Sequence, residues 1–284
     1  MAVKTTHALI TAAGADQRRL PLQFLTDHAG AWKPAIVIQI DEMIAAGIER
    51  VGVVVRPVDR PAYESVLAGF GAAVTLIEQS SPDGYGRAVL CGRAFTEGRP
   101  FLLQVSDHLY VSHVATSCTR QLLALADAES CAVSAVQATH ESQLQFYGTV
   151  AGSLVPGRPG CYQIENVIEK PTPTAAEQQC VVPGLRSGHY LCFFGMHVLT
   201  PTVFDLLAAE AAARPHERIG LSPSLARLAQ REKYLAAELA GRRADLEAHF
   251  GVLRAQIALG LNGPAREELL ALLAEELALF AGRR

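Results

Sequence analysis

The chain has 284 residues, of which 50% are hydrophobic and 19% are charged, so it can bury a large core without disulfides or structural metals. Its net charge of −3 and its isoelectric point of about 6.3 give no basic footprint, which argues against nucleic-acid binding. The first residues contain no long apolar segment, and no apolar run is long enough to cross a bilayer. We therefore expect a cytoplasmic protein with no membrane or nucleic-acid partner.

Strand-like and helix-like segments alternate through the first half of the chain. Residues 34–46 place Ile36, Ile40 and Met43 on one helical face, and Gly47 follows where a C-cap is expected. This alternation is typical of a parallel sheet with helices on both faces. Further strands are predicted at 51–55, 73–77, 101–105 and 131–136, and further helices at 87–94 and 117–126.

From about Tyr147 the pattern changes to shorter strands, predicted at 162–168 and 189–198. Thr200 and Pro201 are expected as the N-cap and first residue of a helix that continues to residue 207.

No change of composition marks a linker, so we expect one α/β domain over residues 1–261. Residues 262–284 carry a broad apolar stripe, which predicts a C-terminal helix that packs on its own body or on a second subunit.

Six cysteines are scattered along the chain without a Cys-x-x-Cys pair. Several lie in apolar runs, where a thiol behaves as a small hydrophobic side chain. We predict buried free thiols rather than zinc ligands or disulfides. The six are Cys91, Cys118, Cys131, Cys161, Cys180 and Cys192.

The segment after the first predicted strand carries the strongest functional signal. Residues 8–11 are apolar and lead into Ala12, Ala13 and Gly14, followed by a basic segment. In an open α/β sheet, such a turn places backbone N–H groups at the carboxyl end of the first strand, where ligands bind. No Gly-x-Gly-x-x-Gly series begins at Gly14, which disfavours a dinucleotide-dependent oxidoreductase.

Taken in order, these landmarks resemble the bacterial UTP–glucose-1-phosphate uridylyltransferases, within the sugar-phosphate nucleotidyltransferase superfamily. The strongest stretches are residues 33–48, 79–91, 101–109, 167–171 and 195–207. The resemblance implies a Rossmann-like, mostly parallel sheet with helices on both faces, shorter strands in the second half, and a homo-oligomer. It also implies that an oxygen of a sugar-1-phosphate, glucose-1-phosphate being the expected one, attacks the α-phosphorus of UTP. Mg²⁺ and basic side chains would neutralise the charge.

Two aspartates match the positions at which that family holds Mg²⁺. Asp107 follows a buried strand, and its alternative role is an Asx turn that caps the strand. Asp245 matches the second metal aspartate, with Glu247 in place of the family's glycine; its alternative role is an exposed acid at the start of a helix. His108 replaces the acid that the family carries beside the first aspartate.

The nucleotide-binding positions implied by the resemblance are Ala13, Gly14, Gln79 and Gly84. The side-chain amide of Gln79 offers a donor and an acceptor together, which matches the imide edge of uracil. Gly84 would let the backbone approach the base, although an ordinary glycine-rich turn is the alternative.

The sugar-phosphate side of the expected site consists of residues from three segments. By the resemblance, the carboxylate of Glu169 would accept hydrogen bonds from sugar hydroxyls, while Lys170 would face the phosphate and take part in catalysis. A solvated surface pair is the alternative for these two, and strand packing is the alternative for Gly195. The full set implied by the resemblance is Tyr147, Gly148, Glu169, Lys170 and Gly195.

The phosphate-binding loop departs from the family's pattern. Arg18 corresponds to the arginine that clamps the triphosphate, but Asp16 and Gln17 replace a glycine and a threonine. A carboxylate ~4 Å from a phosphate costs about 1 kcal/mol even in water. The family's Pro-Lys segment is absent, and Lys33 matches a different lysine further along the chain.

Two hypotheses therefore follow. In the first, the protein is an active uridylyltransferase that forms a UDP-sugar and releases pyrophosphate, with Arg18, Lys170 and Asp107 as catalytic residues. In the second, it is a catalytically silent relative that binds nucleotide or sugar nucleotide as a regulatory or partner subunit.

Overall fold

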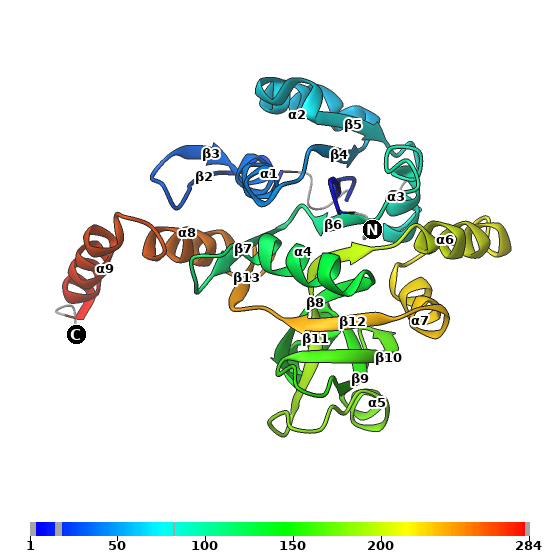
Figure 1. Cartoon of the computed structure of the whole chain (residues 1–284). Coiled ribbons are helices and arrows are strands. Elements are labelled where there is room, and N and C mark those ends of the chain that lie inside the picture. The colour runs from blue at the N-terminus through cyan, green and yellow to red at the C-terminus, as the bar shows by residue number, and fades with distance from the viewer. Residues whose placement is uncertain (1–3, 15–18, 82, 282–284) are drawn as a thin grey trace.

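The computed structural model describes residues 4–14, 19–81 and 83–281, which build one large sheet with helices on both faces (Figure 1). Within those residues the large sheet has nine strands in the order β5-β4-β1-β6-β11-β8-β12-β10-β9. The strands are β1 (His7–Thr11), β4 (Arg50–Val55), β5 (Val74–Glu78), β6 (Phe101–Val105), β8 (Ala132–His140), β9 (Gly148–Leu154), β10 (Cys161–Glu169), β11 (His189–Leu199) and β12 (Tyr234–Glu238).

The sheet is mixed, so the expectation of a mostly parallel sheet is not confirmed. Strands β5, β4, β1 and β6 are parallel neighbours, as are β8 and β12. Strand β11 runs antiparallel to both β6 and β8, and β10 runs antiparallel to β12 and β9. Parallel neighbours need long crossover connections, usually helical. The regular alternation of strands and helices ends at β8, and the connections after it lead mainly to antiparallel pairs.

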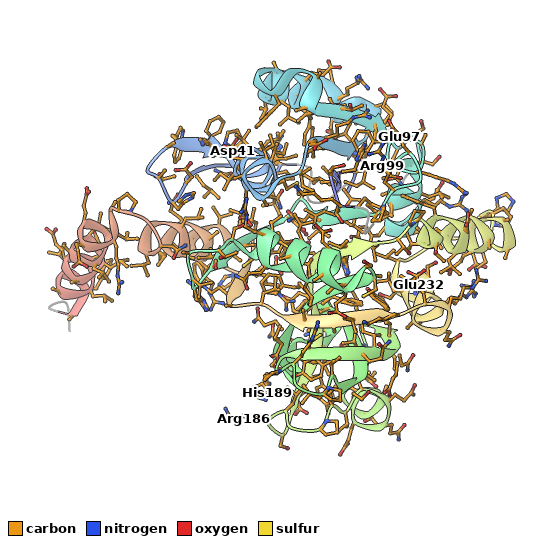
Figure 2. All side chains as sticks on the ribbon, in the orientation of Figure 1. Asp41, Glu97, Arg99, Arg186, His189 and Glu232 are labelled. Carbon is orange, nitrogen blue, oxygen red and sulfur yellow. The ribbon has the colours of Figure 1, made fainter. Side chains whose placement is uncertain are left out.

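Alternation of side chains along β1 divides the core between the two faces of the sheet. Ala8 and Ile10 pack with helices α1 (Ala35–Ala46), α2 (Arg60–Leu67) and α4 (Cys118–Glu129). Leu9, between them, packs on the opposite face with α3 (Tyr85–Cys91), α6 (Thr202–Ala213) and α7 (Ser222–Arg231). Helices therefore cover both faces, as predicted. Charged side chains such as Glu97 and Arg99 lie on the outside (Figure 2).

Local sequence signals explain some of the helix ends. Gly47 adopts a left-handed conformation with φ of +106° and ends α1, as predicted. Ser117 accepts a hydrogen bond from the backbone of Arg120 and begins α4. The helix predicted to continue to residue 207 is confirmed as α6 and runs on to Ala213, but the predicted cap was wrong. Pro201 is the N-cap, the helix begins at Thr202, and the hydroxyl of Thr200 donates instead to Glu232 Oε1 at 2.5 Å.

Two small two-stranded sheets flank the large one. Strand β2 (Phe24–Thr26) pairs with β3 (Trp32–Pro34), and β7 (His108–Ser112) pairs with β13 (Gly241–Asp245). Helix α8 (Gly251–Leu261) packs against both small sheets in a separate apolar cluster. A short helix, α5 (Pro173–Gln179), lies near strands β9 and β10 at one edge of the large sheet (Figure 1).

The last helix, α9 (Arg266–Ala281), extends away from the body beyond α8 (Figure 1). None of its residues is buried, and its exposed apolar side chains are Leu270, Leu272, Leu277, Leu279 and Phe280. Among the described residues, most of the predicted apolar stripe is therefore exposed, with Leu269 and Leu273 partly buried. No helix in the described part of the chain combines the length and the apolar character that crossing a membrane would require.

The six cysteine thiols are all free, as predicted, and four of them, Cys118, Cys161, Cys180 and Cys192, are buried.

Candidate functional site

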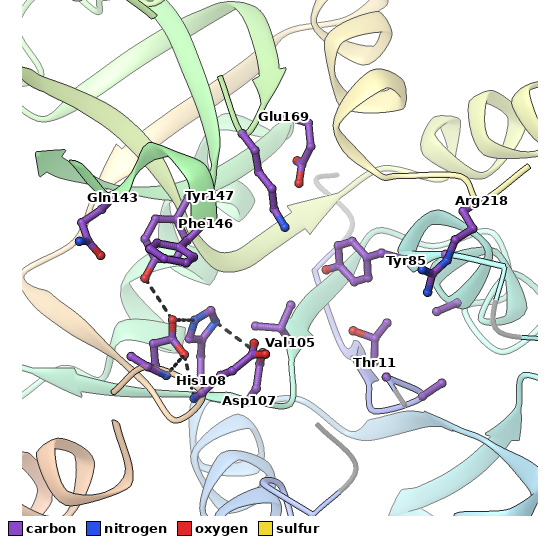
Figure 3. A pocket seen from close by; sticks show the side chains of 18 of the residues that line it. Thr11, Tyr85, Val105, Asp107, His108, Gln143, Phe146, Tyr147, Glu169 and Arg218 are labelled. Atoms are coloured by element: carbon purple, nitrogen blue, oxygen red, sulfur yellow. Dashed lines mark hydrogen bonds and ion pairs between the residues drawn. The ribbon is translucent and has the colours of Figure 1, made fainter. Parts of the chain in front are cut away.

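A cleft of about 920 Å³ lies at the carboxyl ends of the parallel strands β1 and β6. Its volume is in the range of small-molecule sites, and its position is the one at which open α/β sheets bind ligands. The lining residues come from both halves of the chain (Figure 3). They are Thr11, Ala13, Gly14, Gln79, Gly84, Tyr85, Ala88, Val105, Asp107, His108, Gln143, Phe146, Tyr147, Glu169, Lys170, Arg218, Asp245, Glu247, Ala248 and His249.

Nine of the predicted site residues line this one cleft: Ala13, Gly14, Gln79, Gly84, Asp107, Tyr147, Glu169, Lys170 and Asp245. Gly148 and Gly195 are not among the lining residues and lie behind the side chains that are. Arg18, together with Asp16 and Gln17, falls outside the described residues.

The two predicted metal ligands lie on either side of one imidazole ring. His108 Nδ1 is 3.7 Å from Asp107 Oδ1, and His108 Nε2 is 3.5 Å from Asp245 Oδ2 (Figure 3). Mg²⁺ binds its oxygen ligands at about 2.1 Å. One ion held by both carboxylates therefore does not fit this arrangement, because the ring stands where the ion would be. Among the described residues, no group of three or more His, Cys, Asp or Glu side chains is suited to a metal.

Asp245 is held by a dense set of hydrogen bonds. Its Oδ1 accepts the backbone N–H groups of Glu247 at 2.9 Å and Ala248 at 3.2 Å, and its Oδ2 accepts the hydroxyl of Tyr147 at 3.1 Å. Burial alone would raise the pKa of Asp245, but the contacts with His108, Tyr147 and the backbone lower it to about 2.

Tyr147 thus contacts a predicted metal ligand. The guanidinium of Arg243 lies 3.5 Å from the centre of its ring and also donates to the carbonyl of Phe193. Burial raises the pKa of the Tyr147 hydroxyl, so the group is a neutral donor to Asp245 near pH 7. The position expected to touch the sugar therefore also orients an acid at the floor of the cleft.

Gln79 and Gly84 lie together at the other end of the cleft. Gln79 is buried, and its amide donates to the carbonyl of Gly84 at 3.4 Å. Gly84 has φ of +102° and ψ of 168°, torsions that are essentially restricted to glycine. A Cβ at this position would also lie 2.5 Å from the carbonyl oxygen of Ile219. Glycine is therefore needed at position 84 for the close contact with the backbone of Ile219, independently of any contact with a ligand.

Glu169 ends strand β10 and points into the cleft with a fixed orientation. Ser222 donates to its Oε2 at 2.5 Å. Gly148, its partner across the β9–β10 pair, makes room for this contact, because a Cβ there would lie 3.1 Å from Ser222 Oγ and 3.2 Å from Glu169 Oε2. Lys170 follows with φ of +46°, an uncommon conformation for a residue with a side chain.

Lys33 does not reach the cleft. Its Nζ contacts Asp27 Oδ2 at 3.0 Å and Asp41 Oδ2 at 2.8 Å, on the β2–β3 hairpin and α1. Both hydrogen bonds raise the pKa of Lys33, with that to Asp41 contributing most. The lysine is therefore committed to two carboxylates and cannot replace the missing phosphate-binding lysine from this position.

Sequence reasoning missed Arg218, which lines the cleft near Tyr85 (Figure 3). It lies in an exposed loop without a motif, so no local signal marks it. The loop is nevertheless anchored, because Ile219 N donates to Asp83 O at 2.9 Å and Gly86 N donates to Ile219 O at 2.8 Å. Among the described lining residues, two side chains are those of lysine or arginine, namely Lys170 and Arg218. Four others carry carboxylates.

Comparisons with known proteins agree with the resemblance found in the sequence. The chain is 26% identical to the UTP–glucose-1-phosphate uridylyltransferase of Streptococcus pneumoniae, with 93% of each chain covered. It is 29% identical to a protein of the same name from Bacillus subtilis, with 96% of each covered. No family model matches the chain.

Solved structures show the same fold. A UDP-glucose pyrophosphorylase solved with UDP-glucose superposes with a TM-score of 0.72 at 24% identity, covering 89% of this chain and 98% of the other. A UDP-glucose pyrophosphorylase from Acinetobacter baumannii superposes with a TM-score of 0.74 at 20% identity, covering 96% and 99%. The resemblance to bacterial uridylyltransferases is thereby confirmed, and the fold is that of these structures.

Proposed function

We propose, from its likeness to bacterial UTP–glucose-1-phosphate uridylyltransferases, that this protein transfers a uridylyl group from UTP to a sugar-1-phosphate. Glucose-1-phosphate is the expected acceptor, and the products are a UDP-sugar and pyrophosphate. The observation that carries the proposal is the meeting of Gln79 and Gly84 with Glu169 and Lys170 in one cleft. The two pairs are far apart in the sequence. The first matches the positions expected to bind the nucleotide, and the second matches those expected to bind the sugar phosphate.

The chemistry asks the protein chiefly to align two polyanions. An oxygen of the sugar phosphate forms a bond to the α-phosphorus of UTP, and the bond to the β-phosphate oxygen breaks with its electron pair leaving on pyrophosphate. The attacking oxygen is already ionised, so no general base is needed. Alignment and cationic contacts are therefore the main contributions of the side chains.

Each half of the cleft has a part in that alignment. The amide of Gln79 pairs with the imide edge of uracil, and the backbone at Ala13 and Gly14 approaches the phosphates. Glu169, fixed by Ser222, accepts hydrogen bonds from sugar hydroxyls. Lys170 provides positive charge beside the transferring phosphoryl group. Arg18 as a triphosphate clamp, Asp107 as a catalytic residue and Mg²⁺ on the UTP phosphates remain predictions from the resemblance.

A catalytically silent relative is the second candidate function. Two observations favour it: Lys33 is engaged by Asp27 and Asp41, and the ring of His108 lies between the predicted metal ligands. Such a protein would bind a sugar nucleotide in the same cleft and act on a partner. Under either function we expect a cytoplasmic homo-oligomer, with residues 262–284 as the assembly segment.

Pyrophosphate release measured over a panel of nucleoside triphosphates and sugar-1-phosphates separates the two functions. Activity with UTP and glucose-1-phosphate that falls at least 10-fold in Lys170→Met supports the transferase. The exposed Lys233, paired with Glu129, provides the control variant Lys233→Met, which should retain activity. No turnover with any pair, together with a thermal shift on adding UDP-glucose, would instead support the silent relative.

The identity of the base is tested by Gln79→Glu, which removes the amide donor while keeping the length of the side chain. We expect the KM for UTP, or the Kd for UDP-glucose, to rise at least 10-fold. The exposed Gln230→Glu adds the same charge outside the cleft and should leave both constants unchanged.

A further inference from the structure

The two acids expected to share a metal ion are separated by a side chain of this chain itself. The ring of His108 makes one contact of 3.7 Å to Asp107 and one of 3.5 Å to Asp245, through opposite nitrogens (Figure 3). We infer that His108 takes the place between the carboxylates and that no single divalent cation bridges Asp107 and Asp245 in this protein. Shortening residue 108 opens a bridging site.

The fold holds the ring in this place. His108 is buried, and its backbone lies in β7 opposite Asp245 in β13. The carbonyl of His108 accepts the side-chain amide of Gln39, which also donates to Val105 O at 2.9 Å. The residue is therefore fixed by both strand pairing and a buried side chain from α1.

Gly195 makes the room that the ring occupies. Its φ is +88°, and a Cβ there would lie 2.7 Å from His108 Nδ1. This is closer than real Cβ atoms come to a neighbour, so any larger residue at 195 would displace the ring. The glycine that the sequence suggested for sugar contact thus accommodates His108.

The hydrogen bonds of the two acids make them unequal as metal ligands. Asp245 already accepts two backbone N–H groups and the hydroxyl of Tyr147, and it also faces His108 Nε2. A carboxylate has about four lone-pair sites, so a cation must displace one of these partners. Asp107 is tied through its backbone, where its carbonyl accepts Leu246 N at 2.8 Å. From the described residues its carboxylate accepts no comparable set of hydrogen bonds and faces His108 Nδ1 at 3.7 Å. The inference concerns the cleft of the proposed function but does not need turnover to be tested.

Binding of Mn²⁺ alone, followed by the electron paramagnetic resonance signal of the free ion, measures the bridging site directly. Mn²⁺ prefers the same oxygen ligands as Mg²⁺. We expect the native chain to bind Mn²⁺ weakly, and Asp245→Asn to leave that affinity unchanged. His108→Asp should bind one Mn²⁺ at least 10-fold more tightly, and adding Asp245→Asn to it should abolish the gain.

A matched control separates an opened site from added charge. His249 lines the same cleft but is exposed, so His249→Asp adds a carboxylate without clearing the space between the two acids. We expect no tightening in that variant. His108→Ala opens the space without adding charge and should also bind Mn²⁺ more tightly, which covers the case in which His108→Asp does not fold.

Two results would overturn the inference. One is a native chain that binds a single Mn²⁺ with an affinity lost in both Asp107→Asn and Asp245→Asn. The other is an affinity in folded His108→Asp and His108→Ala no higher than that of the native chain. Neither result bears on pyrophosphate release, so this inference and the proposed function can fail independently.

Discussion

Gly84 shows how a single residue combines a backbone requirement with a position in the cleft. Its torsions and the 2.5 Å approach of a Cβ to Ile219 O both exclude a side chain. We expect Gly84→Ala to lower the free energy of unfolding by about 2–4 kcal/mol, from backbone strain together with overpacking. Denaturant unfolding measures the loss. Gly69, where a Cβ meets nothing within 4 Å, provides the control Gly69→Ala, which should cost less than about 1 kcal/mol.

Asp245 should contribute to stability only where it is ionised. Its pKa of about 2 in the folded chain lies below the ordinary value of 3.8, so its contribution is complete above pH 4 and is lost as the pH falls through 2. The shift corresponds to about 2 kcal/mol. We expect Asp245→Asn to lower the free energy of unfolding by about that amount at pH 7.

Chemical unfolding at pH 7 and near pH 2 measures this difference. The loss should be much smaller at the acidic end, because near pH 2 Asp245 is protonated in the unfolded chain and about half protonated in the folded chain. Asp205, an exposed partner of Arg93, provides the control Asp205→Asn, for which little change is expected. An equal loss for Asp245→Asn at both pH values would contradict the prediction.

At the scale of single residues, the sequence predicted where many polar groups lie but not what they contact. Gln79 and Asp107 follow the parallel strands β5 and β6, whose carboxyl ends meet at one edge of the sheet, so their convergence could be predicted. Glu169 and Lys170 lie at the end of β10, which runs antiparallel to β12, so their place in the cleft was implied by the resemblance and not by the strand pattern. Arg218 could not, because its place depends on the docking of a loop from the second half of the chain on the Gly84 backbone.

Three strands of the large sheet are joined by a buried polar chain. Ser134 on β8 contacts His197 Nδ1 on β11 at 2.6 Å and the hydroxyl of Tyr234 on β12 at 2.5 Å. Burial lowers the pKa of His197 to about 3, so the ring is neutral in the folded chain at neutral pH. The network satisfies groups that would otherwise be unpaired inside the sheet.

This network makes the sheet sensitive to mild acid. Between pH 6.5 and 3 the unfolded chain protonates residue 197 and the folded chain does not, so stability falls as the pH falls, by about 1.4 kcal/mol per pH unit. We expect His197→Gln to have a lower free energy of unfolding than the native chain at pH 7.5. Acidification to pH 4.5 should lower that free energy less in the variant than in the native chain. Denaturant unfolding at both pH values tests this. The exposed His216 provides the control His216→Gln, whose free energy of unfolding should fall between the two pH values as much as that of the native chain.

At the scale of elements, the regular periodicities of the first half could be read directly. Helix α1 and strands β4, β5 and β6 lie within one or two residues of their predicted bounds. Strands β7 and β13 were not predicted, because each contains polar residues whose burial depends on the partner strand. The antiparallel position of β11 between β6 and β8 could not be predicted either, because strand order depends on long-range pairing and not on the local sequence pattern.

For the whole molecule, the exposed apolar side chains of α9 predict self-association. Leu272 is 53% exposed and Leu277 is 72% exposed, on a helix with no buried residue of its own. Large uncovered apolar surface is typical of protein interfaces. We expect a native mass at least twice the 30.4 kDa of one chain, and a monomer for Leu272→Lys combined with Leu277→Lys.

Sedimentation equilibrium measures these masses at several concentrations. Leu154 on β9 is 52% exposed and provides the control Leu154→Lys, which should keep the native mass. A native chain that sediments as a monomer at all concentrations would contradict the prediction.

The position of β11 has a consequence for the order in which the protein can be completed on the ribosome. Strands β6 and β8 are synthesised first, yet each needs β11 as a neighbour, and β8 also needs β12. A nascent chain that ends before residue 189 therefore carries bare apolar strand edges, which invite aggregation. Synthesis must pass residue 238 before the sheet is whole, so unpaired strand edges persist through most of translation.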